Sequence, residues 1–566
     1  MRAAAFYLGL ALLVALPALQ SSEPAFLGHP DSDMWKHAWG HWWLGNHLRH
    51  FSWPIFTTLQ NYPWGGNLFV IDPFNAMLAA VLGIFVPPTA SFNAIVVGQL
   101  ALAGWGAWRL ATRLTGDSWA ALVAGVVYGF SPWVLSYSVS SGVSETLGLA
   151  WIPLSAHWML GAAEGQRRDV PLAAAALFLA GFNSWYYLFF ALLLWGLLAG
   201  GALLGSLPAW PAWRHVVIAG MLAAVALSPL AWKFSSSMAT KSLGPIDREE
   251  FAKSPEYLQN FFTVSDFVLP GKDRLRVTST VDRLAQTPYL GLLALALAIL
   301  AWRRREARVW AWGAAIFCVL SLGPMVGLTR GWGSSAPING LYWLWQHGFG
   351  LWLATSPSRI HVLTTLCVAM LAAFGLARFT AARPVLGMVA AGLVFAEVGL
   401  LSPAEFPVPI SSAAIPAVYD GLALDDKSGV FDVPPVHYNS QLIPGQYYFY
   451  QTRHGGGIPY RAGGVFDARL TDNRYFTEMW RLGVGVWPAA RDPVSAAVGL
   501  EALGKLGYRH VVLHADRMPP RAFASALATL RRWLGPPVAS DGGTVRFVLT
   551  PLATRSAKSA TMSAAP

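Results

Sequence analysis

The sequence predicts a mainly α-helical, polytopic membrane protein with about eleven spans and a small α/β domain at its carboxyl end. Of the 566 residues, 55% are hydrophobic and only 12% are charged, and the mean hydropathy is +0.44. Charged residues make up about a quarter of ordinary soluble domains, so this composition excludes that class. The formal net charge of +11 does not indicate a nucleic-acid partner, because many basic residues cluster between apolar segments, as in cytoplasmic loops.

The first apolar segment, residues 3–19, is either a signal peptide or a first membrane helix. The residue that would end its cleavage site, Gln20, is unfavourable there, which favours an uncleaved helix. In both cases the chain from residue 21 emerges outside. We therefore expect a large first outside loop over residues 21–90.

Later apolar segments predict the remaining spans. The segment 170–204 is too long for one crossing at about 1.5 Å per residue, so we expect two helices broken near Asn183-Ser184. The other segments are residues 91–114, 118–139, 143–163, 216–232, 289–302, 309–328, 360–379 and 384–401.

Basic clusters between these segments predict the topology. Placing all of them inside makes the spans alternate without conflict, with the amino end inside and the carboxyl end outside. Loops 140–142, 233–288 and 329–359 then lie outside. The clusters are Arg109 with Arg113, Arg167-Arg168, Arg214, Arg303-Arg304-Arg305 with Arg308, and Arg378 with Arg383.

One apolar segment, residues 71–87, would break this alternation if it crossed the membrane. It begins with Asp72-Pro73, contains Asn75 and ends at Pro87-Pro88. We therefore expect a re-entrant or interfacial segment that does not span.

The composition changes at Ser402, where a proline-rich linker begins. Residues 1–401 are predicted to form the membrane domain, and residues 402–553 a small α/β domain outside the membrane. Residues 429–433 and 508–514 have the β-branched and aromatic content of strands, and residues 495–505 have a helical pattern. The tail, residues 554–566, is expected to be disordered.

The first outside loop carries the strongest catalytic candidates, Asp31 and Asp33, ahead of a helix expected over residues 33–50. A carboxylate can take a proton from an acceptor hydroxyl, and the pair can also bind a divalent metal ion. The alternative is structural: Asp31 or Ser32 caps the helix, and Asp33 favours its positive end. The four tryptophans of this helix, at positions 35, 39, 42 and 43, suit a membrane interface.

Other charged residues are candidates for substrate binding. Lys36 and His37 lie on the polar face of the predicted helix, and Arg359 precedes a span from the outside, where a guanidinium can hold a phosphate bidentately. Glu145 lies close to the same surface. Each also has a structural interpretation, as a solvated face, a snorkelling arginine or a polar group in the bundle.

Two histidine patterns point to further chemistry. Asp33, His37 and His41 repeat at metal-ligand spacing on one helix face, although no fourth ligand is evident. His454 lies in an aromatic, glycine-rich stretch, residues 447–457, whose residue types suit a sugar ring. A hairpin or packed strand with a glycine turn explains the same stretch.

These motifs together resemble the GT-C superfamily of membrane glycosyltransferases, such as protein O-mannosyltransferases and lipid A aminoarabinose transferases, and a YfhO-like bacterial branch. The resemblance rests on the acidic, tryptophan-rich first loop with Asp31 and Asp33, and on residues 62–67, 125–132, 357–359 and 450–457. It implies a first-loop aspartate as base, a polyprenyl-phosphate sugar donor, and a glycan, lipid or protein acceptor. It also implies a multi-pass protein of the bacterial inner membrane that acts on its outer face.

A different class of function remains open: a non-catalytic membrane protein that binds, flips or presents a lipid-linked glycan. A transporter is expected to carry ionisable residues in discontinuous helices near the midplane, and Glu397 is the clearest acidic residue inside a span. The two functions are distinguished first by whether Asp31 and Asp33 converge with Arg359.

Overall fold

The computed structural model describes residues 2–549 except 53–55, 68–71, 240–260, 263–286, 324–338, 343–356, 423, 425–426, 437–442, 461–465 and 484–492. Most of the predicted loops 233–288 and 329–359, and the predicted disordered tail, lie outside the described residues. The chain forms two compact units. The first comprises residues 1–34, 71–239 and 244–412, and the second comprises residues 35–70, 240–243 and 413–566.

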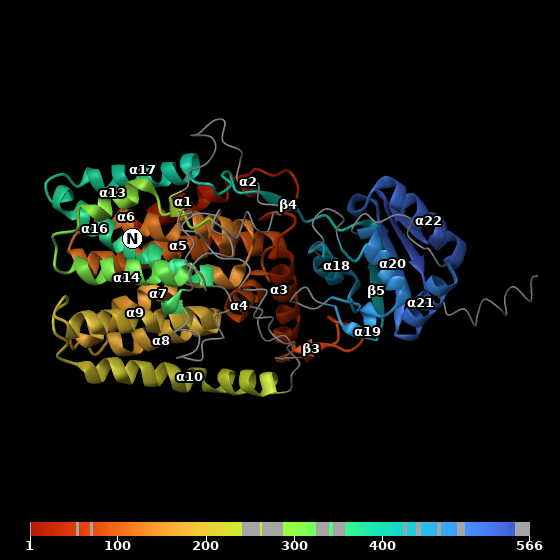
Figure 1. The fold of residues 1–566 in the computed structure, drawn as a ribbon, viewed down its shortest axis with the longest axis horizontal. Helices are drawn as coiled ribbons and strands as arrows, with labels where there is room; N and C mark the ends of the chain where they lie inside the picture. Colours follow the sequence, from red (N-terminus) through yellow and green to blue (C-terminus); the bar gives the residue numbers. More distant parts are fainter. Residues whose placement is uncertain are drawn as a thin grey trace, which may run out of the picture. The chain divides into compact units, whose positions relative to one another are not determined.

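The first unit is a helical bundle whose long helices run alongside one another (Figure 1). Its central helix is α16 (His361–Thr380), whose apolar stretch is wholly buried inside the protein. The other helices are α1 (Arg2–Val14), α2 (Leu16–Leu19), α4 (Pro73–Leu82), α5 (Pro88–Thr115), α6 (Ala121–Gly129), α7 (Trp151–Ala163), α8 (Asp169–Asn183), α9 (Trp185–Leu203), α10 (Trp213–Ala239), α13 (Leu292–Ile299), α14 (Ala307–Ser321) and α17 (Val385–Leu401).

Four helices among the described residues are long and apolar enough to cross a membrane, or five if the bent pair formed by α6 and the turn after it is one span. Five further apolar helices are shorter, at 10 to 17 residues. The chain is therefore a mostly helical membrane protein, and the number of about eleven spans stays a prediction.

The predicted break in the long apolar segment is confirmed. Helix α8 ends at Asn183 and α9 begins at Trp185, with Ser184 between them in an extended conformation. An extended residue cannot continue the helical hydrogen bonds, so two antiparallel helices replace one long helix.

The predicted inside loops meet at one end of the bundle. Arg113 on α5 pairs with Glu164 after α7 at 2.6 Å, and the Ala212 N–H before α10 donates to Ala163. At the same end the Thr380 hydroxyl of α16 donates to Asp117 at 2.5 Å. Four of the five basic clusters thus share one end, in agreement with the topology prediction, and the side of the membrane stays a prediction.

Helix α4 occupies the apolar segment that would have broken the alternation of spans. It has ten residues, capped by the Asp72 side chain, which accepts from the Asn75 N–H. Ten residues extend about 15 Å, half of a hydrocarbon core. The helix length favours the prediction that this segment does not span.

The second unit is built on a four-stranded sheet in the order β5-β6-β8-β7. Strands β5 (Gly429–Val433) and β6 (Tyr508–His514) are parallel, and β8 (Thr544–Val548) and β7 (Ala539–Asp541) continue antiparallel. Both predicted strands and the predicted helix, now α21 (Pro493–Lys505), are present. The other helices are α3 (Met34–Arg49), α18 (Gln446–His454), α19 (Ala468–Thr471), α20 (Arg474–Gly483) and α22 (Pro520–Leu534), with a small hairpin of β2 (Phe56–Thr57) and β3 (Gly66–Asn67).

The second unit also holds residues 35–70, which the sequence analysis assigned to the membrane domain. The Tyr62 side chain anchors this loop: its hydroxyl donates to Lys427 O at 2.6 Å, and the Tyr508 hydroxyl donates to Tyr62 O at 2.8 Å. Gly457 and Gly507 make room for the ring, since an added Cβ at either would lie 2.2 Å from Tyr62. Such long-range docking leaves no local pattern in the sequence.

Helix α3 forms over the predicted range, but its environment differs from the predicted interface. Trp35, Trp39 and Trp43 are at most 5% exposed, and Trp35 packs 5.6 Å from the Phe449 ring of the same unit. These three tryptophans are therefore buried in protein and do not lie at a membrane interface, as the sequence analysis had expected of them.

Candidate active site

The candidate site is organised by the bend after α6. The π-helical turn η1 (Val134–Ser140) meets α6 at 48°, and the 3-10 turn η2 (Ser144–Ala150) follows. Between them Gly142 has a φ of +61°, and an added Cβ would lie 2.2 Å from that of Met34. A glycine is therefore needed both for the backbone and for the close approach. The bend brings Tyr137 of η1 and Glu145 of η2 to the same place.

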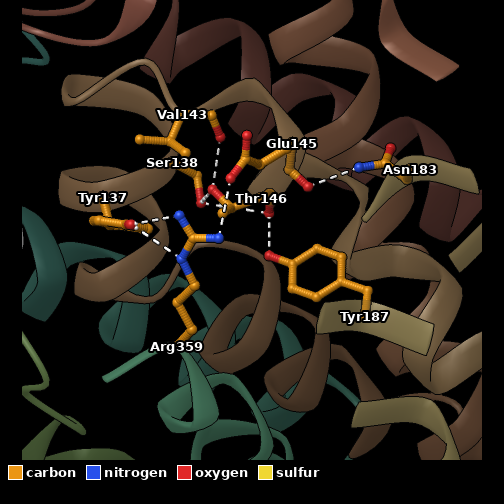
Figure 2. A network of polar contacts seen from close by, with 8 residues as sticks. All are labelled: Tyr137, Ser138, Val143, Glu145, Thr146, Asn183, Tyr187 and Arg359. Carbon is orange, nitrogen blue, oxygen red and sulfur yellow. Dashed lines mark hydrogen bonds and ion pairs between the residues drawn. The ribbon is translucent and has the colours of Figure 1, made fainter. Parts of the chain in front are cut away.

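Arg359 is the centre of the polar network at this bend (Figure 2). It lies on the turn η5 (Pro357–Ile360), immediately before α16. Its Nη1 lies 3.0 Å from Glu145 Oε1, and its Nε and Nη2 donate to the Tyr137 hydroxyl at 3.1 and 2.9 Å. The guanidinium also lies over the Tyr186 ring, 4.5 Å from its centroid. An arginine has five N–H donors, so three are used by protein groups.

The Arg359 and Glu145 side chains are only 12% and 14% exposed. Such a shielded pair requires both charges to be well satisfied, because taking either out of water costs several kcal/mol. The stacked tyrosines supply a further favourable contact with the cation. The site is therefore a preorganised cationic group that keeps limited access to solvent.

The Glu145 backbone is held by a second layer of hydrogen bonds. The Asn183 amide donates to Glu145 O at 2.7 Å, and the Tyr187 hydroxyl donates to Thr146 O. The Thr146 hydroxyl donates in turn to Ser138 Oγ at 2.8 Å. Asn183 and Tyr187 flank the confirmed break between α8 and α9, so that break positions the site.

A buried carboxylate that the sequence analysis did not single out lies next to this network. Asp72 is 1% exposed and accepts from the Ser144 hydroxyl at 2.5 Å and from the Asn75 amide at 2.8 Å. Asn75 also donates to Ser144 O, and the Gln99 amide of α5 donates to Asn75 at 2.6 Å. Asp-Pro followed by Asn at the start of α4 is a helix-capping pattern, and it could have identified Asp72 as a cap.

Asp33 is fixed against the same bend. Its N–H donates to Ser141 O at 3.1 Å, and the His29 N–H donates to Ser140 O at 2.8 Å. The Asp33 side chain is exposed. The structure therefore brings Asp33 to the loop that carries the partners of Arg359.

Asp31 and Ser32 show how the start of α3 is held. The Ser32 hydroxyl accepts from the Met34 N–H at 3.4 Å, and the Asp31 N–H donates to His29 Nδ1 at 3.2 Å. This contact joins residues two positions apart in the turn before the helix, so a cap by Asp31 or Ser32 stays a prediction. Among the described residues no group of three or more His, Cys, Asp and Glu side chains could hold a metal ion, so the Asp33, His37, His41 stripe does not form such a set.

The other candidates lie in the second unit. On α3, Lys36 is half-buried and His37 is 7% exposed. His454 is 1% exposed and stacks 5.5 Å from the Tyr419 ring. Burial lowers the pKa of His454 to about 4. The stretch around it forms helix α18, ended by Gly455 with a φ of +71°, in place of the hairpin or strand considered from the sequence. His454 therefore packs in the interior of its unit.

The fold matches solved membrane glycosyltransferases, whereas the sequence alone identifies no relative. No protein-family model matches the sequence, and no curated protein is significantly similar to it. Arabinofuranosyltransferase AftD from Mycobacteria superposes with a TM-score of 0.58 over 97% of this chain at 16% identity. The chain spans 40% of the length of AftD.

Two further structures extend this comparison. Oligosaccharyltransferase AglB from Archaeoglobus fulgidus superposes with a TM-score of 0.50 at 12% identity, over 93% of this chain and 71% of AglB. ArnT from Cupriavidus metallidurans covers 96% of this chain and 98% of its own at 14% identity, with a TM-score of 0.42, too low to support an argument. The chain therefore shares its overall fold with these two glycosyltransferases, AftD and AglB.

Proposed function

We propose that this protein transfers a sugar from a polyprenyl-phosphate donor to an acceptor hydroxyl on the outer face of the bacterial inner membrane. The observation that carries the proposal is the hydrogen bond from Asp33 N–H to Ser141 O. It holds an exposed carboxylate beside the bend whose Tyr137 and Glu145 contact Arg359. Base and phosphate anchor then belong to one site.

The chemistry assigns one role to each group. The acceptor oxygen bonds to the anomeric carbon as the bond from that carbon to the phosphate oxygen breaks. Asp33 takes the acceptor's proton, and the leaving phosphate keeps the electron pair. Arg359 stabilises the charge that develops on the phosphate through its remaining N–H donors. Asp31 is the alternative base, since it lies two positions away in the same loop.

Glu145 and Asp72 complete this assignment. Glu145 orients Arg359 before the donor arrives, and the donor phosphate competes with it for the guanidinium. Asp72 holds the adjacent Ser144 and so positions Glu145 without touching substrate. Lys36 and His37 are further candidates for donor binding on α3.

A divalent metal ion fits only as part of a complex with the donor. Asp31 and Asp33 supply two carboxylates, and Mg²⁺ is commonly bound by one or two carboxylates together with substrate phosphates and water. The metal would then neutralise the leaving group. Turnover measured with and without a chelator tests this role separately from that of Arg359.

The neighbours support a lipid-linked donor. AftD is an arabinofuranosyltransferase, and the AglB structure contains an inhibitory peptide and a dolichol-phosphate. By the topology predicted from the basic loops, the site and the carboxyl-terminal unit lie outside. The acceptor is a glycan, lipid or protein reached from that side.

The alternative is a non-catalytic protein that binds, flips or presents a lipid-linked glycan. Its strongest candidate residue for transport, Glu397, has a structural role. Glu397 accepts from the Tyr289 hydroxyl at 2.6 Å and from the Leu292 and Leu293 N–H groups at 2.5 and 3.1 Å. It therefore caps the start of α13, a structural use of a buried carboxylate. This favours surface chemistry over midplane transport.

The deciding experiment is turnover of a panel of polyprenyl-phosphate sugars by the purified full-length protein. Asn caps a helix as well as Asp does, so D33N preserves the fold while removing the base. We expect D33N to bind donor normally and to lose turnover by about 10² to 10⁴-fold. The matched control D472N changes an exposed aspartate outside the site. Full turnover in D33N, D31N and the double variant would leave the binding function ahead.

A further inference from the structure

A second polar cluster lies at the opposite, basic end of the bundle, and the proposed glycosyl transfer does not use it. Arg109 on α5 and His157 on α7 face each other, with Arg109 Nη2 3.0 Å from His157 Nε2. Each lies six residues before the end of its helix, about 9 Å inside at 1.5 Å per residue. The pair is therefore set deeper in the bundle than the loop charges.

The protonation of this pair follows from chemistry. A guanidinium has only donors, so His157 Nε2 must accept and the single ring proton must sit on Nδ1. His157 is 7% exposed, and its Nδ1 is buried without a partner. Arg109 Nε and Thr112 Oγ1, on neighbouring turns of α5, are likewise buried without partners. Two N–H donors and a hydroxyl thus lack an acceptor.

The charge of Arg109 is also uncompensated. Of the carboxylates in the described part of the chain, none lies within ion-pair distance of Arg109. The nearby Arg113 already pairs with Glu164 at 2.6 Å and with Asp169 at 3.7 Å. The other close neighbour of Arg109 is the Trp105 ring, 5.6 Å away. A poorly solvated cation without a counterion costs several kcal/mol, which an anion would remove.

The surroundings indicate where the anion comes from. Trp105 and Trp158 flank the pair and are half-buried, as tryptophans are at a membrane interface. Arginines just inside the end of a span reach the headgroup level by extending their side chains. Donors without acceptors, a free positive charge and interfacial tryptophans together match a lipid headgroup.

We infer that Arg109, held by His157, binds the phosphate oxyanion of a membrane lipid in the leaflet at the basic end of the bundle. The phosphate accepts from the guanidinium and supplies its missing counterion. The same chemistry would accept free phosphate. This site is separate from the one that contains Arg359.

Native mass spectrometry of the full-length protein with added phosphatidylglycerol tests the inference. Losing a charge-assisted hydrogen bond typically weakens binding about tenfold or more, so we expect R109Q to bind the lipid at least about tenfold more weakly. R109K keeps the positive charge but lacks the planar set of guanidinium N–H donors, so its lipid affinity should fall less than that of R109Q. The matched control R378Q removes an exposed arginine on α16 and should bind as the unmodified protein does.

The two sources of phosphate are distinguished by adding excess inorganic phosphate. If the lipid is the ligand, phosphate does not displace it, and if free phosphate is the ligand, it raises the melting temperature of the unmodified protein but not of R109Q. Equal lipid affinity and equal response to phosphate in the unmodified protein, R109Q and R109K would overturn the inference. Donor turnover in R109Q reports that the variant is folded.

Discussion

The guanidinium of Arg359 lies 3.0 Å from the carboxylate of Glu145, and the two residues come from different helical turns of the first unit. The pair is nearly shielded from water, so an anion that enters must replace or share Glu145 rather than bind an unpaired cation. This relationship makes donor affinity a competition between two anions.

The competition predicts opposite effects for the two partners. E145Q keeps the size of the side chain but removes the competing charge, so we expect donor to bind several-fold more tightly. R359A removes the phosphate contact and should weaken donor binding about tenfold or more. Donor dissociation constants measured on the purified protein check both. Equal affinity in all three proteins would exclude Arg359 from the phosphate site.

The buried Asp72 predicts a positioning role for Ser144. S144A removes the hydroxyl that donates to Asp72 at 2.5 Å, and leaving a buried carboxylate short of a donor costs about 1 to 3 kcal/mol. We expect both the melting temperature and donor affinity to fall. S144T retains the hydroxyl and should restore donor affinity. Loss of stability in S144A with unchanged donor affinity would show that Asp72 is structural only.

Glu397 predicts a stability effect without a functional one. E397A leaves the Tyr289 hydroxyl and the Leu292 and Leu293 N–H groups without their acceptor. Each such group costs about 1 to 3 kcal/mol, so the melting temperature should fall clearly. The control is E405A, which removes an exposed glutamate and should leave the melting temperature unchanged. Normal stability in E397A, or lost turnover at full stability, would contradict a capping role.

His454 predicts how the second unit responds to acid. Burial lowers its pKa from 6.5 to about 4, with the nearby Asp432 opposing and His510 adding to the shift. As the pH falls below 6.5, His454 is protonated in the unfolded chain before it is protonated in the folded protein. Stability is therefore complete above pH 6.5 and falls by about 3 kcal/mol down to pH 4.

The control for this pH dependence is H454N. Its side-chain oxygen can replace His454 Nδ1, which accepts from the Gly456 N–H at 3.1 Å. Hydrogen exchange of residues 429–433 across pH 4 to 7 should show a smaller slope in H454N. Burial lowers the pKa of His510 to about 4 as well, so part of the slope should remain. An unchanged slope would exclude His454.

The topology is tested by reporter fusions. The basic loops that meet at one end of the bundle predict that Gly165 lies inside and Ala404 outside. An enzyme reporter that is active only in the periplasm should be active when fused at Ala404 and silent when fused at Gly165. The reverse pattern would overturn both the topology and the assignment of the site to the outer face.

Elements with a strong local signal were predictable. The break at Ser184 followed from the length of an apolar run against the thickness of a membrane, and β5 and β6 followed from β-branched and aromatic residues. Helix α18 was harder, because its aromatic residues and the glycines after it fit a hairpin equally well. The aromatic face of α18 becomes buried only when the helix packs in its folded unit.

Sequence patterns were enough to predict the membrane class, most helices, the grouping of the basic loops and the residue types available for phosphate chemistry. Periodicity, the length of apolar segments and helix-terminal residues are local properties, so they can be identified from the sequence. The contacts of Glu145 and Tyr137 with Arg359, of Asp72 with Ser144 and of Tyr62 with Tyr508 arise only when the chain folds. Buried charges and donors take whichever partner the fold brings within hydrogen-bond distance, and these partners are 72 to 446 positions apart in the sequence.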